Sequence, residues 1–339
     1  MTTEQDIQQS SSSFRWLYPL LLALTVATGI KIFTTRFINL EWQNTYNWAV
    51  YFACYFLSVL LFNKLNNKTA NNVEDKHPAY FWPMPGLSGK LGVLAKSFIF
   101  VTSNFISLFN PFLFVQQLRL TFGMIRVSAR IRGREATIEN YKTKASYRLP
   151  FRGTWLIYHG GNTQQTSHSW QVLNQRYAYD FVMADSDYKR HKKTGFEVGH
   201  YLCYGQDILA AADGEVVKVV CSESKSPLVG WFFINPFSKQ AAGNYIVIKH
   251  EQNEYGFYAH LVKGSIPLKA GDKVKAGQLI GQCGFTGSTT EPHLHFHLQD
   301  SPSFYHSVGL PLRFSAVSIN HTKHLNAILF RGSFVANSD

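Results

Sequence analysis

The chain has 339 residues, enough for two structural units, since one domain commonly takes about 100–200 residues. Hydrophobic residues make up 45% of the chain and charged residues only 16%, which is below the roughly 25% charge that is usual in soluble domains. This composition excludes a disordered or fibrous protein and indicates a chain partly dissolved in lipid. The formal net charge is +12, and four cysteines are too few for a small fold built on disulfides.

Apolar stretches near the N-terminus predict transmembrane helices. Phe14–Phe33 is charged only near its ends, and a helix of its length covers roughly 30 Å, the thickness of a bilayer's hydrocarbon core. Trp42–Asn63 carries no charge. A third run, from Leu91 to about Gln116, is weaker, because Pro111 could kink it or it could lie on the surface. The alternatives are a cleaved signal peptide for the first run and a buried core helix for the second.

The orientation of these spans depends on lysines and arginines in short loops. With three spans, the four lysines between the second and third runs favour a cytoplasmic N-terminus and an exported C-terminal half. With only two spans, the same residues give the opposite orientation. Residues 1–116 are therefore expected to form a membrane region with two or three transmembrane helices.

After about Leu118 the pattern of residues changes from long apolar runs to short runs in which polar and apolar residues alternate. Arg126–Arg132 alternates with period two, which predicts a strand within a β-rich connecting segment, residues 117–154. No long amphipathic helix is evident in this half. Short β-rich runs separated by glycine turns follow, so residues 155–339 are predicted to be mainly antiparallel β. The runs are Glu215–Val220, Asn244–Lys249 and Phe257–Leu261.

The excess of basic residues in this half suits two interpretations. It could favour anionic cell-wall polymers or lipid headgroups, or it could serve solubility. A nucleic-acid partner is not expected, because the sequence has neither a helix-turn-helix pattern nor Cys/His fingers.

The sharpest motif is the segment Pro292–Leu298, which reads PHLHFHL. Side chains two residues apart in a strand share a face and lie about 7 Å apart at Cα, so three imidazoles can converge on one ion. The three apolar residues between them are expected on the opposite, buried face. The two sets are His293, His295 and His297, and Leu294, Phe296 and Leu298.

Four further motifs precede this strand in a fixed order. They are the turn and strand Ala211–Val217, the segment Tyr258–Leu261 (YAHL), Lys269–Ile280 (KAGDKVKAGQLI) and the glycine-containing loop Gly281–Glu291. Together with PHLHF they resemble the lysostaphin-like zinc metalloendopeptidases, the M23 family of peptidoglycan hydrolases. The resemblance covers roughly residues 201–298, with looser similarity from about 155, and implies a peptidase domain over residues 155–339.

The resemblance implies a role for particular residues. The second histidine of H-x-H, here His295, ligates Zn²⁺, while the first, His293, and the histidine of Y-x-H-L, His260, act as catalytic acid/base groups or stabilise the transition state. The family also has an upstream histidine and aspartate as ligands. The common H-x-x-x-D spacing is absent, so a longer-spaced variant with His168 and Asp180 is expected.

Alternatives remain open for several of these positions. His159 could replace His168 as the first ligand, since it also precedes Asp180. Asp180 could instead pair with Arg176. His297 stands where the family commonly has Glu, and it either supports the site from behind His295 or lies at the rim of the cleft. Two neutral imidazoles and one carboxylate would leave Zn²⁺ with a net charge of about +1 and an open fourth position.

The resemblance therefore implies a zinc endopeptidase that hydrolyses peptide bonds in peptidoglycan cross-links or stem peptides. The expected location is the bacterial cytoplasmic (inner) membrane, with the peptidase domain on the exported side, periplasmic or extracellular. Its expected partners are peptidoglycan peptides, the lipid bilayer and a regulatory membrane protein. The alternatives are a catalytically silent scaffold or activator of other wall hydrolases and a protease with a substrate outside the wall. A biotinyl or lipoyl carrier is disfavoured, because the loop Phe285–Ser288 lacks the lysine that such carriers need.

Overall fold

The structure is a computed structural model that describes residues 18–37, 50–51, 53–55, 57–58 and 82–338. The chain divides into two units, Met1–Lys76 and His77–Asp339.

The first unit contains helix α2, Tyr18–Phe37. Its segment Leu20–Phe37 is long and apolar enough to cross a membrane, and little of it is buried. A helix is therefore confirmed over the described part of the first apolar run, while a signal sequence near an N-terminus would have the same length and composition. The second predicted run, Trp42–Asn63, lies largely outside the described residues, and those that are described within it, from residue 50 to 58, are helical.

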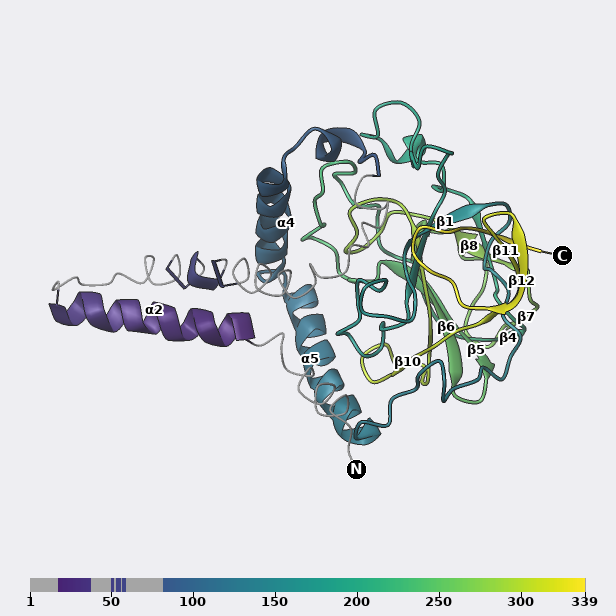
Figure 1. Ribbon diagram of the computed structural model, residues 1–339, viewed down its shortest axis with the longest axis horizontal. Coiled ribbons are helices and arrows are strands. Elements are labelled where there is room, and N and C mark those ends of the chain that lie inside the picture. Colours follow the sequence, from purple (N-terminus) through teal and green to yellow (C-terminus); the bar gives the residue numbers. More distant parts are fainter. Residues whose placement is uncertain (1–17, 38–49, 52, 56, 59–81, 339) are drawn as a thin grey trace. The chain divides into compact units, whose positions relative to one another are not determined.

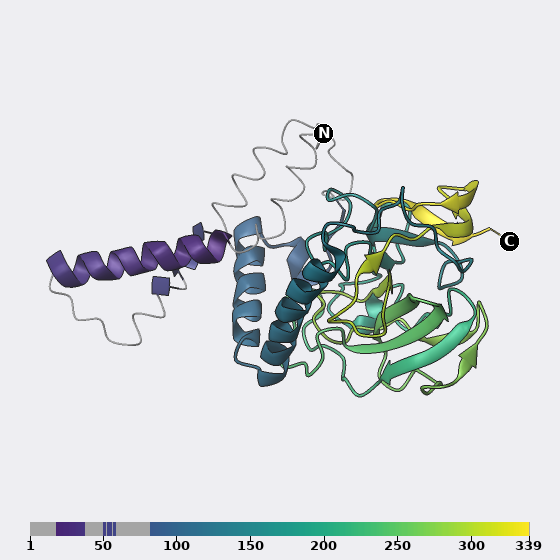
Figure 2. The ribbon, with the colours of Figure 1, turned by 90° about the horizontal axis from the view of Figure 1, so that it is seen from below.

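The second unit begins with a short 3₁₀ helix, η3 (Gly86–Gly89), and two α-helices, α4 (Val93–Ser107) and α5 (Pro111–Ile131). The axes of α4 and α5 differ by 93°, and Figure 2 shows them as the two arms of a V beside the β-sheet. The bend follows from Asn110 and Pro111. Asn110 caps α5, because its Oδ1 accepts hydrogen bonds from the amides of Phe112 and Leu113, and Pro111 takes the first helical position, where no amide is needed. The third apolar run is thus kinked at Pro111.

The strand predicted for Arg126–Arg132 is wrong, because residues up to Ile131 belong to α5. The helix buries Gly123 and Val127, which lie four residues apart on one face, and a Cβ at position 123 would meet the carbonyl oxygen of Tyr305 at 1.8 Å. The arginines and apolar residues that alternate in this segment therefore occupy the faces of a helix and not the two faces of a strand. Residues 117–154 contain no strand, and only Tyr147 forms an isolated bridge, with Phe314.

The rest of the unit is antiparallel β, as expected, and Figure 1 shows its strands beside α5. Eleven strands form one sheet in the order β12-β11-β13-β1-β2-β9-β6-β5-β4-β7, with β10 paired to β9, and β3 and β8 form a second sheet. A single-turn 3₁₀ helix, η4 (Val198–His200), precedes β3. The strands are β1 Trp155–His159, β2 Tyr179–Val182, β3 Asp207–Leu209, β4 Gly214–Val220, β5 Asn244–Glu251, β6 Glu254–Leu261, β7 Lys273–Val274, β8 Leu279–Gln282, β9 Leu294–Gln299, β10 Gly309–Leu310, β11 Phe314–Ile319, β12 Thr322–Ala327 and β13 Phe334–Asn337.

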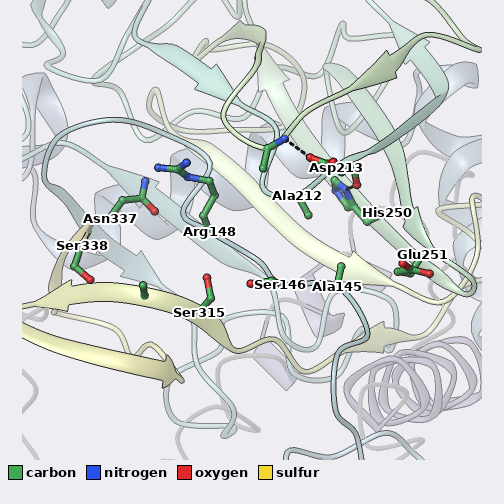
Figure 3. A pocket seen from close by; sticks show the side chains of 12 residues that line it. Ala145, Ser146, Arg148, Ala212, Asp213, His250, Glu251, Ser315, Asn337 and Ser338 are labelled. Carbon is green, nitrogen blue, oxygen red and sulfur yellow. Dashed lines mark hydrogen bonds between the residues drawn. The ribbon is translucent and has the colours of Figure 1, made fainter.

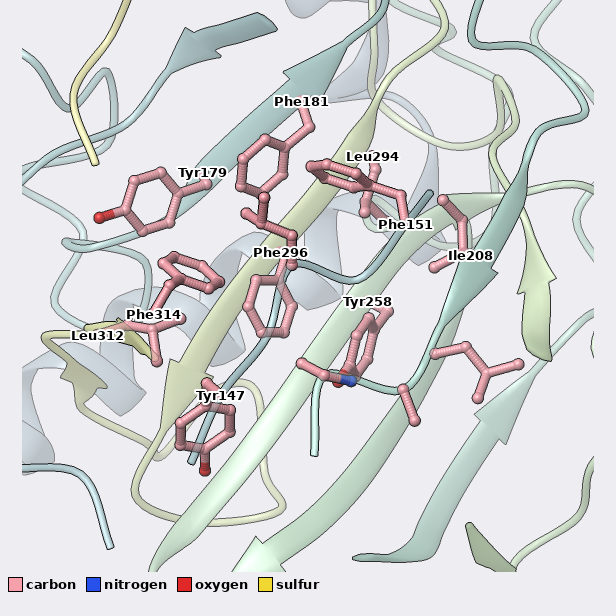
Figure 4. Close-up of a cluster of buried hydrophobic side chains, with 14 of the residues drawn as sticks. Tyr147, Phe151, Tyr179, Phe181, Ile208, Tyr258, Leu294, Phe296, Leu312 and Phe314 are labelled. Carbon is pink, nitrogen blue, oxygen red and sulfur yellow. The ribbon is translucent and has the colours of Figure 1, made fainter. Parts of the chain in front are cut away.

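The main core lies against one face of this sheet. Leu294, Phe296 and Leu298 of β9 are fully buried in it, beside Tyr258 of β6 and Phe181 of β2 (Figure 4). Burying a side chain of this size contributes about 1.5–3 kcal/mol, so this alternating set fixes the register of β9. The predicted buried face of β9 is confirmed, and the histidines of the strand therefore lie on its other face.

Candidate metal centre

The register of three neighbouring strands brings the candidate residues together. β9 lies between β2 and β6, and His295 pairs with Asp180 of β2 on one side and with Ala259 of β6 on the other. His260 is the next residue of β6, and His293 directly precedes β9. Residues more than 100 positions apart in the sequence are therefore neighbours because of strand pairing.

The side chains converge on the buried carboxylate of Asp180. Nδ1 of His295 lies 2.9 Å from Oδ1, and Nε2 of His293 lies 3.6 Å from the same oxygen. Nδ1 of His168 lies 3.4 Å from the other oxygen, Oδ2. Arg176, the alternative partner of Asp180, instead pairs with Glu135. The five predicted residues thus form one cluster, since the ring nitrogens of His260, His293 and His295 also lie within 4.8 Å of one another.

His260 is held in a strained backbone conformation. Its φ is +63°, in the left-handed region, and the pairing of β5 with β6 shifts register beside it. Strained residues of this kind persist where the surrounding structure holds them, and they are concentrated at functional sites. Nδ1 of His260 donates to the carbonyl of Thr286 at 2.7 Å, which leaves Nε2 as the unprotonated nitrogen of the neutral ring.

His293 is fixed in the same way by its own loop. Its Nδ1 donates to the carbonyl of Glu291 at 2.9 Å, so in the neutral ring Nε2 is unprotonated and lies on the side of Asp180. The ring centres of His260 and His293 are 4.7 Å apart. The two histidines therefore present a pair of basic nitrogens to the same space.

Burial and neighbouring charges set the ionisation of this cluster. Burial alone would raise the pKa of Asp180, but the imidazoles of His168, His293 and His295 outweigh it and hold that pKa well below its usual value. Burial lowers the pKa of His168, and burial with the neighbouring His293 and His295 lowers that of His260 strongly. Asp180 is therefore held as a carboxylate, and burial favours the neutral rings of His168 and His260, which are ionisation states that a metal needs.

A hydrogen-bond chain behind His295 assigns the proton on its ring. Gln299 donates its amide nitrogen to the carbonyl of Ser301 at 2.8 Å, so its Oε1 must be the atom 3.0 Å from Nε2 of His297. Nε2 of His297 therefore carries the proton, and its Nδ1 accepts from Nε2 of His295 at 3.0 Å. Nδ1 of His295 is left unprotonated, 2.9 Å from a carboxylate oxygen. Two acceptors at this separation repel each other unless a cation lies with them.

His297 is fully buried, so its placement at the rim of the cleft is wrong, whereas its contact with His295 from behind is confirmed. Burial lowers the pKa of His297 to about 3, so the ring is neutral as the hydrogen bonds require. Gln299 was missed in the sequence, although it continues the two-residue spacing of His293, His295 and His297.

A buried ion pair supports the loop that holds His293. Nε of Arg190 lies 3.1 Å from Oε1 of Glu291, and the Arg190 guanidinium also packs over the ring of Tyr158. Glu291 is the residue whose carbonyl accepts from His293. No sequence signal links Arg190 to Glu291, because they are distant in the chain and belong to no common motif.

Glycine is required where the loop Gly281–Glu291 passes His260. Gly284 forms a bridge with His293, and a Cβ on it would lie 2.6 Å from the carbonyl oxygen of His260. A side chain there would displace the end of β6. The loop thus lies low beside the cluster, because glycine at this position admits the close approach of two backbones.

His159 lies beside the cluster, in contact with His168. The centres of their rings are 4.8 Å apart, and burial lowers the pKa of His159 to about 3. His159 lies opposite Asp180 in the pairing of β1 with β2, but its ring packs against Tyr158 and His168, whereas His168 directs a nitrogen at the carboxylate. The geometry therefore favours His168 over His159 as the partner of the carboxylate.

A pocket of about 470 Å³ lies elsewhere on the unit, beside Arg148, Asp213, His250 and Asn337 (Figure 3). Its lining contains none of the residues that converge on Asp180. His250 is engaged there by the carbonyl of Asp213 and the hydroxyl of Tyr258. The candidate metal centre and this pocket are therefore separate features.

Residues 193–304 match the model of peptidase family M23. The glycyl-glycine endopeptidase ALE-1 of Staphylococcus capitis is 30% identical over 160 residues, 42% of this chain and 39% of the relative. The peptidoglycan DD-endopeptidase ShyA of Vibrio cholerae is 51% identical over 57 residues, 17% of this chain and 13% of the relative. The catalytic domain of lysostaphin from Staphylococcus simulans covers 50% of this chain and 90% of its own at 24% identity, with a TM-score of 0.26.

This chain thus spans less than two fifths of the length of the curated relatives that it matches first. The segment that matches the family model contains His260, His293 and His295. His168 and Asp180 lie upstream of that segment.

Proposed function

We propose that the second unit is an M23-type zinc endopeptidase that hydrolyses peptide bonds in peptidoglycan cross-links or stem peptides. The observation that carries the proposal is the approach of the unprotonated Nδ1 of His295 to the carboxylate of Asp180, 2.9 Å apart. Two neutral imidazoles and one carboxylate, from His168, His295 and Asp180, are a donor set that suits catalytic zinc. The family match and the endopeptidase relatives support the same class of reaction.

The residues around the cluster suit peptide hydrolysis. Zinc held there would supply Lewis-acid polarisation of the scissile carbonyl and a nucleophile at neutral pH. His260 and His293 present unprotonated Nε2 atoms, which can accept a proton from the attacking water and return it to the leaving amine. The carbonyls of Thr286 and Glu291 keep both rings in that orientation.

The substrate class and the location rest on further proposals. The names of the similar proteins point to peptidoglycan peptides, and the small residues of the loop around Gly284 suit a narrow substrate of glycine or small residues. We place residues 155–339 as the peptidase domain on the exported side of the bacterial inner membrane, with α2 as an anchor. A regulatory membrane partner would fit such an arrangement.

The test uses the full chain, purified in detergent and incubated with peptidoglycan, with released fragments identified by mass. Wild type should release peptide fragments, and a chelator should abolish release. His295→Ala should lose more than about 100-fold in rate, because even groups behind a metal ligand are worth 10–100-fold. His324→Ala, on the exposed strand β12, is the matched control and should keep full activity.

Two outcomes would contradict the proposal. Release that survives chelation and the His295→Ala substitution would exclude the metal mechanism. Bound zinc without any release would instead support the alternative of a scaffold or activator of other hydrolases.

A further inference from the structure

Helix α5 presents an apolar stripe on the side opposite to its buried face. Phe114, Leu118, Phe122 and Ile125 follow one another at helical spacing and are between 41% and 59% exposed. The opposite side of the helix buries Leu113, Gly123 and Val127 in the unit. A stripe of this kind on an amphipathic helix is unpartnered within the described part of the chain.

Helix α4 and the bend also expose large apolar side chains. Leu94 and Phe98 of α4 are 82% and 67% exposed, and Phe109 in the bend is 74% exposed. Phe237, 75% exposed, is held beside the bend, because the Asn110 side chain donates to the carbonyls of its neighbours Pro236 and Ser238. We call this surface the elbow face. It comprises Leu94, Phe98, Leu108, Phe109, Phe112, Phe114, Leu118, Phe122, Ile125 and Phe237.

The charged residues of the segment that forms most of the elbow face are all basic, and one of them, Arg130, pairs with Asp300. Residues 91–134 contain no aspartate or glutamate. Arg119 and Arg126 each follow a residue of the stripe, Leu118 and Ile125, so they border it along one flank of α5. The basic residues of the segment are Lys96, Arg119, Arg126, Arg130, Arg132 and Arg134. An exposed apolar stripe bordered by arginines is complementary to the acyl chains and anionic headgroups of a lipid surface.

We propose that the elbow face inserts into the interface of an anionic lipid bilayer and docks the second unit onto it. The bend of 93° between α4 and α5 disfavours a straight span and favours helices that lie along the surface. The same chain carries α2, a helix long and apolar enough to cross a membrane. This helix favours a lipid bilayer, rather than a protein, as the surface that the elbow face contacts. This inference does not depend on the proposed peptidase activity.

The elbow face is connected to the candidate metal centre by one loop. Gln116 of α5 donates to the carbonyl of Lys239 and accepts from the amide of Ala241. The next carbonyl, of Ala242, accepts from the amide of His260 at 3.2 Å. Docking through this face would therefore hold the cleft close to the bilayer surface, where only substrate near the membrane could reach it.

The test labels the full chain in nanodiscs that contain anionic lipid. Phe98→Cys and Phe122→Cys are made with Cys54→Ser and Cys221→Ser, since Cys203 and Cys283 are buried, and each new cysteine carries an environment-sensitive fluorophore. Leu325→Cys, 82% exposed on β12, is the control. Labels at 98 and 122 should be quenched at least about two-fold by nitroxides near the headgroups and upper acyl chains, the depth of an interfacial helix. The label at 325 should not be quenched.

Each other outcome overturns the proposal or a part of it. If the labels at 98 and 122 report an environment as water-exposed as that of the label at 325, the elbow face is not in lipid. Labels that are shielded from water but not quenched by lipid nitroxides would assign the face to a protein partner or a second copy. Strongest quenching at the bilayer centre would indicate a span instead of an interfacial position.

The arginines provide a second measurement. Arg119→Gln combined with Arg126→Gln should reduce quenching of the label at 122 in anionic nanodiscs, while the near-UV circular dichroism spectrum, compared with that of wild type, reports that the unit remains folded. Quenching that is unchanged by these substitutions, and equal in zwitterionic nanodiscs, would overturn the role of anionic headgroups.

Discussion

The position of one proton on His295 decides what its side chain can bind. His297 accepts from Nε2 of His295, and this contact directs the lone pair of Nδ1 toward Asp180. Groups behind a metal ligand commonly fix its tautomer and its orientation. Because His297 is buried and neutral, it provides this acceptor without adding a positive charge that would repel a cation bound at the site.

We expect His297→Phe to lower the affinity for zinc by about 10–100-fold, because the ring of Phe fills the same space but accepts no hydrogen bond from His295. His297→Asn should retain most of the affinity, since an amide oxygen can lie near the position of Nδ1. Competition of the full chain with a chromophoric chelator measures both values. Equal affinities for the Phe and Asn variants would contradict the role of the acceptor.

The residues of the candidate metal centre differ in how readily the sequence alone predicts them. The spacing of His293 and His295 indicates a shared face of a strand, and the motif around His260 identifies that residue by resemblance. His168 and Asp180 could only be proposed, with His159 and Arg176 as competitors, because their spacing fits no compact pattern. The register between β2 and β9 brings Asp180 to His295, and this register is a long-range property.

At the scale of elements, α5 shows why local alternation was misleading. In Arg126–Arg132 the polar and apolar residues alternate, which suits a strand, but Gly123 and Val127 lie on one helical face and pack against the unit. The contact of Gly123 with Tyr305 joins residues 182 positions apart and is invisible to a short window. By contrast, β9 was predicted correctly, because its apolar residues alternate over the whole strand and all enter one core.

The bend before α5 provides a prediction about stability. Asn110→Ala removes the N-cap and both donors to Pro236 and Ser238, so the free energy of unfolding should fall by about 1–2 kcal/mol. Asn110→Asp keeps the cap acceptor but loses the two donors. The free energy of unfolding that Asn110→Asp loses should therefore differ from the loss in Asn110→Ala. Thermal unfolding of the full chain in detergent measures both changes. A fully stable Asn110→Ala variant would show that the bend does not depend on this side chain.

At the scale of the whole molecule, buried neutral histidines make stability depend on pH. Burial lowers the pKa of His250 to about 4, and this residue lies outside the candidate metal centre. Below its ordinary value of 6.5 the unfolded chain binds a proton that the folded chain does not. The stability that the folded protein gains by keeping His250 neutral is therefore fully present above pH ~6.5, and it is lost as the pH falls toward ~4.

We expect the free energy of unfolding to fall by about 3 kcal/mol between pH 7 and pH 4 through His250 alone. His250→Gln cannot titrate, so its stability should decline less steeply over this range, although it begins lower at pH 7. Denaturant unfolding with excess chelator at both pH values measures the two slopes without a contribution from metal. Identical slopes for wild type and His250→Gln would contradict the assignment.

The sequence by itself determined the class of fold, the apolar N-terminal helix and the three histidines near the end of the chain, because these features depend on composition, on periodicity within one element and on contiguous motifs. Tertiary structure alone decided that His168 and Asp180 meet His295, that His297 is buried behind it, and that α5 is a helix with an exposed apolar stripe. Each of these depends on pairing or packing between residues far apart in the chain, which no local pattern encodes.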